Sequence, residues 1–144
     1  QDVMGEEDYA NRLHPMVQAL GEHWTFLGIL PPAELAAFYR LCKLTVLPST
    51  NSTESFGIVQ VESMSCGTPV VASDLPGVRQ PVRMTGMGCV VPPSNASALA
   101  QAIHQVLDDP ERYRGDVQAV IQRFSPRRIA QEYETLFQEL LHSG

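Results

Sequence analysis

The stretch TESFGIVQVESMSCGTPVV, residues 53–71, carries the pattern that decides the fold. Its residues 57–66 predict a helix that ends at a glycine, and residues 69–72 predict an apolar strand directly after it. Two carboxylates, Glu54 and Glu62, stand in this otherwise apolar segment. Because an unpaired carboxylate is costly to bury, each glutamate needs a partner or a function.

Further apolar runs lie on both sides of this stretch and predict additional elements. We predict strands at residues 24–29, 44–47 and 88–91. We predict helices at residues 6–20, 32–42, 95–109, 111–123 and 127–142, the third capped by Asn95 and the last by Ser125. Strands that are apolar throughout and alternate with helices are typical of parallel sheets. The sequence therefore predicts an α/β fold, a Rossmann-like parallel sheet with helices on both faces.

Composition excludes several classes of function. The formal net charge of −6 over 144 residues argues against binding to nucleic acid or to an anionic membrane. The three cysteines are widely spaced and form no CxxC pair, which favours reduced thiols over a disulfide framework or a zinc site. The chain begins with Gln1, so we expect a piece of a longer protein, whose targeting signals cannot be read.

The segment between strand 44–47 and the next helix has the features of an anion site. It leaves the carboxyl edge of the predicted sheet, where open α/β folds bind their ligands. A glycine at position 57 allows close approach of a ligand to the backbone. The first N–H groups of the helix, those of Gly57, Ile58 and Val59, have no partner within the helix and suit an anion such as a diphosphate.

The two glutamates fit the two ends of a nucleotide-sugar. Glu62 lies in line with Ile58 and Val59 on the predicted helix, so we expect it to share a stripe with core residues. A vicinal diol such as that of ribose can donate two hydrogen bonds to one carboxylate. A sugar beyond the diphosphate would place its hydroxyls near Glu54. Taken singly, a capped or arginine-paired Glu62 and a solvated Glu54 are the simpler interpretations, and only the joint pattern argues for a site.

The joint pattern resembles the donor-binding segment of retaining, two-lobed (GT-B) glycosyltransferases of the family 4 type. That family carries two glutamates separated by seven residues, here Glu54 and Glu62, followed by a small-x-Gly-x-Pro-Val-Val pattern, here residues 65–71. Similar stretches of the family match residues 26–30, 35–39, 72–77 and 124–126, so the resemblance covers nearly the whole chain. It differs at Gln80-Pro81-Val82, where the family often has Glu-Val-Val.

The resemblance implies a role for each matching residue. Glu54 matches the glutamate that contacts the donor sugar near its reacting carbon, and Glu62 matches the glutamate that binds the ribose. The family holds the sugar and diphosphate through the backbone of the segment matching Phe56, Gly57, Ile58 and Val59. It cradles the base near the positions of Ile29, Leu30 and Leu35.

The resemblance also implies what the intact protein does. We expect transfer of a hexosyl unit, with retention, from a UDP- or GDP-linked sugar to an unknown acceptor, a glycan, a lipid or a small molecule. No cofactor and no metal are expected, in keeping with the lack of an Asp-x-Asp sequence. A cytoplasmic location is expected, with contact to a membrane surface left open.

The resemblance further implies that other parts of the enzyme lie outside this chain. Residues 1–144 match one partial donor-binding domain, and the N-terminal acceptor lobe and a basic Arg/Lys pair have no counterpart. We therefore expect the isolated chain to be inactive. The strand at 24–29 would lack its neighbours, and its exposed edge would favour self-association.

Alternatives remain open at this point. The chain could be a nucleotide-binding module without transferase activity, and the sequence of the other lobe would decide this. It could belong to another GT-B enzyme such as a sugar epimerase or a phosphorylase, which the spacing of the two glutamates disfavours. A dinucleotide-binding domain is disfavoured because no GxGxxG sequence occurs.

Overall fold

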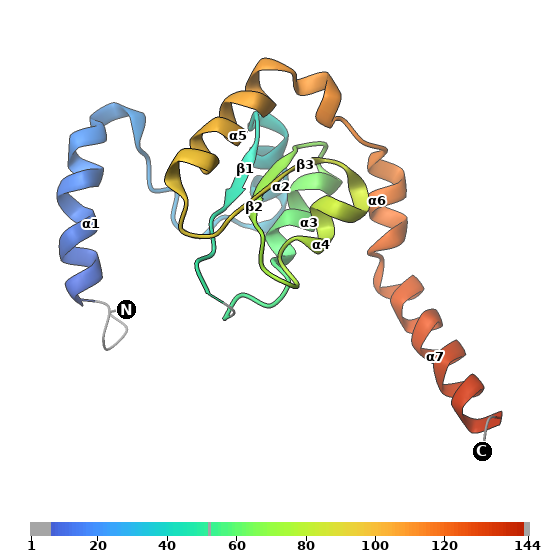
Figure 1. Ribbon diagram of the computed structural model, residues 1–144. Helices are drawn as coiled ribbons and strands as arrows, with labels where there is room; N and C mark the ends of the chain where they lie inside the picture. The colour runs from blue at the N-terminus through green and yellow to red at the C-terminus, as the bar shows by residue number, and fades with distance from the viewer. Residues whose placement is uncertain (1–6, 52, 143–144) are drawn as a thin grey trace. The chain divides into compact units, whose positions relative to one another are not determined.

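A computed structural model describes residues 7–51 and 53–142 (Figure 1). The chain divides into two compact units, Gln1–Pro31 and Pro32–Gly144, and each is considered by itself. The expectation of a single domain remains a prediction.

The first unit is helical at its start and irregular at its end. Helix α1 spans Glu7–Leu20 and continues into a short 3-10 turn, Gly21–His23, in agreement with the predicted helix. The predicted strand at 24–29 is wrong, because residues 24–31 form no regular element. Extended backbone becomes a strand only through hydrogen bonds to a neighbouring strand, and no described residue supplies one. Self-association through that strand edge stays a prediction.

The second unit is built on a parallel sheet of three strands in the order β1-β2-β3 (Figure 1). The strands are β1, Thr45–Leu47, β2, Val70–Ser73, and β3, Gly88–Val91. Leu47 pairs with Ala72, and Ala72 pairs in turn with Val90. These strands confirm three of the predicted strands to within one residue, and their carboxyl ends meet at one edge of the sheet.

Helices connect and cover the strands of the second unit. They are α2, Pro32–Leu41, α3, Ile58–Ser65, α4, Gln80–Thr85, α5, Ala96–Asp108, α6, Val117–Arg123, and α7, Pro126–His142. The predicted caps are confirmed: the Asn95 side chain accepts the N–H of Ala98 at 2.9 Å, and the Ser125 hydroxyl accepts the N–H of Arg128 at 3.2 Å.

The predicted single helix at 111–123 is two elements. A 3-10 turn, Pro110–Tyr113, precedes α6, and Asp116 caps α6 by accepting the N–H groups of Gln118 at 2.9 Å and Ala119 at 3.1 Å. Gly115 lies between them so close to the Met87 side chain that a Cβ atom would collide with it. Gly115 is therefore required by the space beside Met87, and α6 begins directly after its own cap, Asp116.

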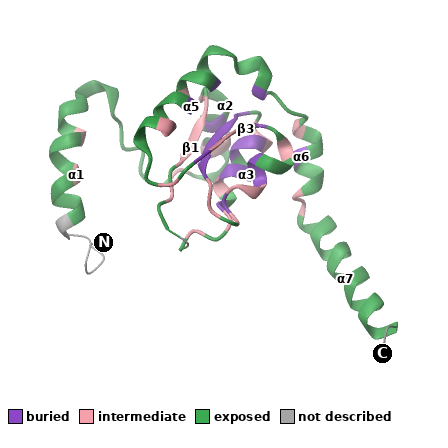
Figure 2. Ribbon diagram, viewed as in Figure 1, coloured by how far each residue is buried: buried purple, intermediate pink, exposed green. Residues whose placement is uncertain are grey.

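The core lies on both faces of the sheet (Figure 2). On one face, Val70 and Ala72 of β2 pack against residues of α3, α4 and α6, including Met64. On the other face, Val71 packs against Val106 of α5 and against Tyr113 of the 3-10 turn Pro110–Tyr113. Successive side chains of a strand point to opposite faces, so a sheet covered twice needs apolar residues throughout. The predicted fold class is confirmed.

Candidate functional site

The β1–α3 loop, described at residues 48–51 and 53–57, leaves the carboxyl edge of the sheet and enters α3. Within it, one carboxylate oxygen (Oε1) of the half-buried Glu54 accepts the backbone N–H of Gly57 at 2.8 Å and that of Phe56 at 3.3 Å. A carboxylate at this position compensates the positive end of the helix. The N–H group of Gly57 was predicted to be free for a ligand, and in the structure it already has an anionic partner.

Gly57 is the residue that turns the chain into α3. Its backbone is in the left-handed region, with φ of 73° and ψ of 65°, a conformation that side-chain-bearing residues rarely adopt. A Cβ atom there would also collide with the side chains of Leu47 and Gln60. The glycine is therefore required both by conformation and by space.

Glu62 lies one helical turn beyond Ile58, on the exposed face of α3. The prediction that it shares a stripe with core residues is wrong, because Ile58 is 60% exposed and Glu62 is exposed as well. The opposite face of α3 holds the buried side chains, Gln60, Val61, Ser63 and Met64. Glu62 is therefore open to a ligand from solvent.

Tyr39 of α2 is the described partner of the Glu62 carboxylate. Its hydroxyl donates to Glu62 Oε2 across 3.4 Å, a long hydrogen bond. Burial raises the pKa of Tyr39, and the negative charge of Glu62 raises it further. The backbone oxygen of Tyr39 accepts a hydrogen bond from the hydroxyl of Thr68, directly after α3. Tyr39 therefore approaches α3 from the α2 side and contacts one oxygen of the exposed Glu62 side chain.

Phe56 connects the loop to the end of α6. Its ring lies 6.2 Å from that of Phe124, centroid to centroid, at an interplanar angle of 60°. Beside this pair is a hollow of about 250 Å³ lined by Phe56, Met84, Arg123, Phe124, Arg128, Ile129 and Glu132. The sequence analysis noted Phe124 only as part of a resembling stretch and did not predict this contact.

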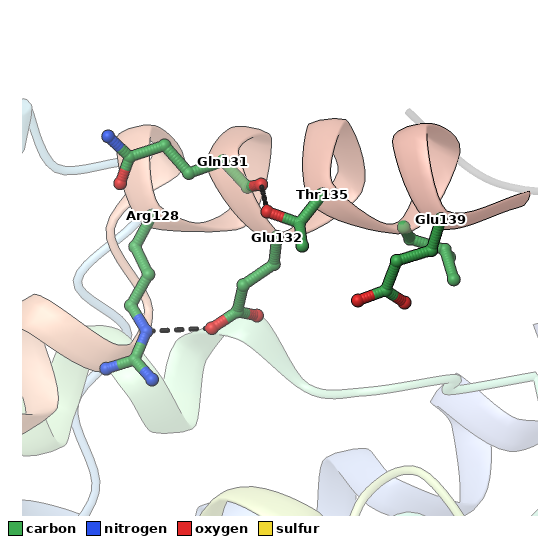
Figure 3. A pocket seen from close by; sticks show the side chains of 6 residues that line it. Arg128, Gln131, Glu132, Thr135 and Glu139 are labelled. Atoms are coloured by element: carbon green, nitrogen blue, oxygen red, sulfur yellow. Dashed lines mark hydrogen bonds and ion pairs between the residues drawn. The ribbon is translucent and has the colours of Figure 1, made fainter. Parts of the chain in front are cut away.

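A second hollow, of about 400 Å³, follows the surface of α7 (Figure 3). An ion pair of 2.8 Å joins Arg128 Nε to Glu132, and the hydroxyl of Thr135 donates to the carbonyl of Gln131 at 3.0 Å. All of its lining residues belong to this one helix. It is therefore a strip of helix surface, and it includes none of the predicted site residues.

The structure brings most predicted site residues together at one helix start. Glu54, Phe56 and Gly57 lie in the loop, Ile58 and Val59 begin α3, and Glu62 follows on the same helix. Leu35 is half-buried on α2. Ile29 and Leu30 belong to the first unit, where Ile29 is fully exposed, so the base-binding assignment remains a prediction.

Within residues 7–51 and 53–142, no three His, Cys, Asp or Glu side chains gather in a way that could hold a metal ion. The expectation that the site works without a metal remains a prediction. None of the described helices is both long and apolar enough to cross a membrane.

Comparison with known proteins identifies similar sequences. The profile of the family described as "Glycosyl transferases group 1" matches residues 2–121. The phosphatidyl-myo-inositol mannosyltransferase of Mycobacterium leprae is 34% identical over 145 residues, covering 99% of this chain and 38% of that protein. The D-inositol 3-phosphate glycosyltransferase of Thermobispora bispora is 45% identical over 82 residues, covering 57% of this chain and 19% of that protein.

Solved structures are similar in fold as well as sequence. The sucrose-phosphate synthase of Thermosynechococcus elongatus matches with a TM-score of 0.77 and 34% identity, over 95% of this chain and 35% of that one. Anabaena Alr3699/HepE, solved in complex with UDP-glucose, matches with a TM-score of 0.77 and 31% identity, over 94% of this chain and 38% of that one. The chain thus spans about two fifths or less of the length of these proteins.

Proposed function

Because this chain belongs to the glycosyl transferases group 1 family, we propose that it binds a nucleotide-sugar donor at the start of α3. The observation that carries the proposal is the pair of hydrogen bonds from the N–H groups of Phe56 and Gly57 to Glu54 Oε1. This helix start already holds an anionic oxygen at hydrogen-bond distance. A diphosphate or a sugar oxygen of a donor would make the same kind of contact.

Donor binding in this site requires an exchange of partners. The N–H group of Gly57 makes its short hydrogen bond to Glu54, so a donor oxygen must replace the carboxylate there. The displaced Glu54 carboxylate then becomes an acceptor for the sugar hydroxyls. In the ligand-free chain, the Glu54 carboxylate therefore occupies the position of a donor oxygen. In the complex, it would contact the donor sugar.

Glu62 would bind the ribose of the donor. Its carboxylate is exposed on α3, and a single described hydrogen bond, from Tyr39, engages only Oε2. Two hydroxyls of a ribose can donate to the remaining acceptor sites of the carboxylate. We assign the base to Ile29, Leu30 and Leu35, following the family resemblance.

The reaction we propose for the intact protein is transfer of a hexosyl unit with retention, as in the family 4 type. The departing diphosphate gains negative charge, and the N–H groups at the start of α3 stabilise it there. Positive charge develops at the reacting carbon of the sugar, and the Glu54 carboxylate stabilises it. The remainder of the catalysis is positioning of donor against acceptor.

The donor we propose is UDP- or GDP-linked, with no cofactor and no metal. Support for a uridine donor comes from the HepE structures, which contain UDP and UDP-glucose. The acceptor, a glycan, a lipid or a small molecule, would bind in an N-terminal lobe. We also propose a cytoplasmic location. Peripheral contact with a membrane is supported by the mannosyltransferase of M. leprae, whose name specifies a phosphatidylinositol.

The test is an amide-resolved NMR titration of the 144-residue chain with UDP-glucose and, separately, with GDP-mannose. We expect one donor to shift the amide resonances of Phe56, Gly57, Ile58 and Val59. Glu62→Gln should weaken that binding about tenfold, because a carboxylate–diol contact is lost. Glu134→Gln removes an exposed charge on α7 and serves as the matched control.

The two outcomes separate clearly. Shifts at Phe56–Val59 that are weakened by Glu62→Gln and unchanged by Glu134→Gln support a donor site. A folded chain that shows no shifts at millimolar donor concentrations, or shifts that Glu62→Gln leaves unchanged, overturns it.

A further inference from the structure

Gln60 occupies the third position of α3, and its side chain is completely buried. Its side-chain nitrogen donates to two backbone carbonyls, that of Val78 at 2.8 Å and that of Phe56 at 3.1 Å. Both hydrogens of the amide are therefore used. Its oxygen, Oε1, has no hydrogen-bond partner among the described residues, and burying such an acceptor is costly. An apolar side chain of the same length would avoid that cost, so the two donated bonds are what the glutamine contributes.

The bond to Phe56 fixes the direction of the N–H group that the proposed donor site uses. The carbonyl of Phe56 and the N–H of Gly57 belong to the same planar peptide unit, and in a trans peptide they point in opposite directions. No cis peptide occurs among the described residues. Gln60 holds the carbonyl end at 3.1 Å, and Glu54 Oε1 holds the N–H end at 2.8 Å.

The bond to Val78 anchors this arrangement to a second loop. The β2–α4 loop, residues 74–79, lies so close to the first that a Cβ atom on Gly77 would collide with the carbonyl oxygen of Ser55. An ion pair of 2.8 Å between Asp74 and Arg79 spans the same loop. Gln60 therefore ties the Phe56–Gly57 peptide to the β2–α4 loop, whose two ends are joined by the ion pair between Asp74 and Arg79.

We propose that Gln60 is a positioning residue of the donor site. It holds the Phe56–Gly57 peptide so that the Gly57 N–H points outward, toward Glu54 in the ligand-free chain and toward the sugar-diphosphate when Glu54 gives way. Gln60 does not itself touch the donor. The inference rests on the proposed function, because it assigns the group that orients the same N–H.

The test compares a donor that reaches this peptide with a ligand that does not. UDP-glucose carries the sugar and diphosphate, whereas UMP carries only the base, the ribose and one phosphate; GDP-mannose and GMP replace them if the chain prefers guanosine. Gln60→Met keeps the length of the side chain and removes both donated bonds. Val106→Ala, in the core on the other face of the sheet, is the control for loss of stability alone.

We expect Gln60→Met to weaken UDP-glucose binding about fivefold to tenfold, because one ordering hydrogen bond is lost. The affinity for UMP should change less than twofold, and Val106→Ala should leave both affinities unchanged. A merely structural role would weaken both ligands alike in proportion to lost stability. Equal loss for both ligands, or no loss for either, overturns the inference.

A second measurement covers the case in which Gln60→Met fails to fold. In the wild-type chain, UDP-glucose should slow hydrogen exchange of the Gln60 side-chain amide protons, whereas UMP should not, and equal exchange rates overturn the inference.

The failure of the proposed function and the failure of the inference can be told apart. If the wild type binds no donor, the proposed function fails and takes the inference with it, whereas intact binding that is indifferent to Gln60 removes the inference alone.

Discussion

Tyr39 donates its hydroxyl to Glu62 across 3.4 Å, so a buried phenol on α2 faces the exposed carboxylate that we assign to the ribose. Burial raises the pKa of Tyr39 above its ordinary value of 10.0, and the charge of Glu62 acts in the same direction. Both effects disfavour the phenolate in the folded chain. The free energy of unfolding should therefore depend on the ionisation of Tyr39 at alkaline pH.

Tyr39 should make folding less stable at high pH. Because its pKa is higher in the folded chain than in the unfolded chain, its contribution is fully present below pH 10 and is lost as pH rises through the folded pKa. Urea unfolding between about pH 8 and pH 11 should show a stability difference between wild type and Tyr39→Phe that falls only at the alkaline end. Tyr133→Phe, at an exposed position on α7, is the control. Parallel pH profiles for wild type and Tyr39→Phe would contradict the prediction.

The contribution of Asp74 to folding stability should have the opposite pH dependence. The hydrogen bond from Arg79 lowers the pKa of Asp74 below its ordinary value of 3.8, and the positive charges of Arg79 and Arg83 lower it further. Its contribution is therefore present above that value and is lost as pH falls through the folded pKa. The urea midpoints of wild type and Asp74→Asn should differ at pH 7 and converge in strong acid. Because the side chain of Asp74 is 40% exposed, 1 M salt should reduce the difference at pH 7, and a difference that persists in acid would rule this explanation out.

Gly57→Ala should destabilise the fold more than Gly86→Ala. Both glycines have left-handed backbone, with φ of 73° and 71°, but a Cβ atom at 57 collides with Leu47 and Gln60, whereas none lies within 4 Å of one at 86. We expect a loss of about 1 kcal/mol at Gly86 from conformation alone. The loss at Gly57 should reach about 3 kcal/mol, because overpacking adds to the conformational cost. The measurement is chemical denaturation of both variants, and equal losses would show that the space around Gly57 is not limiting.

Much of the second unit could be predicted from sequence because its elements are made by local patterns. The strands at 44–47 and 88–91 are apolar runs closed by proline, and Asn95 and Ser125 cap their helices through their own side chains. The predicted helix at 111–123 failed because its apolar residues continue through Gly115 without a change of pattern. The break is marked by Gly115 and by Asp116, which caps α6, a local signal that the apolar spacing outweighed in the prediction.

The predicted strand at 24–29 failed for a different reason. Its residues favour extended backbone, and Trp24 is extended, with φ of −128° and ψ of 131°. A strand also needs a neighbour, and sequence within the run cannot show whether one is present.

At the candidate site, the sequence indicated which residues gather but not how they are bonded. The motif placed Glu54 in the loop before the helix and Glu62 on the helix itself, as the structure has them. It could not show that Glu54 bonds the N–H of Gly57. It also could not show that Gln60 holds the preceding carbonyl, because a glutamine among apolar helix residues has no periodic signal of its own.

We expect the two faces of α3 to differ in their tolerance to substitution. One face carries buried side chains such as Gln60 and Met64, and the other carries Ile58 and Glu62 in solvent. In a saturation mutagenesis survey of residues 58–65, cellular abundance should fall mainly at the buried positions, whereas sugar transfer by the complete enzyme should also fall at Glu62 with abundance unchanged. Abundance should then vary along this helix with its period of about 3.6 residues. The ratio of transfer to abundance should fall at Glu62, which separates the selection for folding from the selection for chemistry.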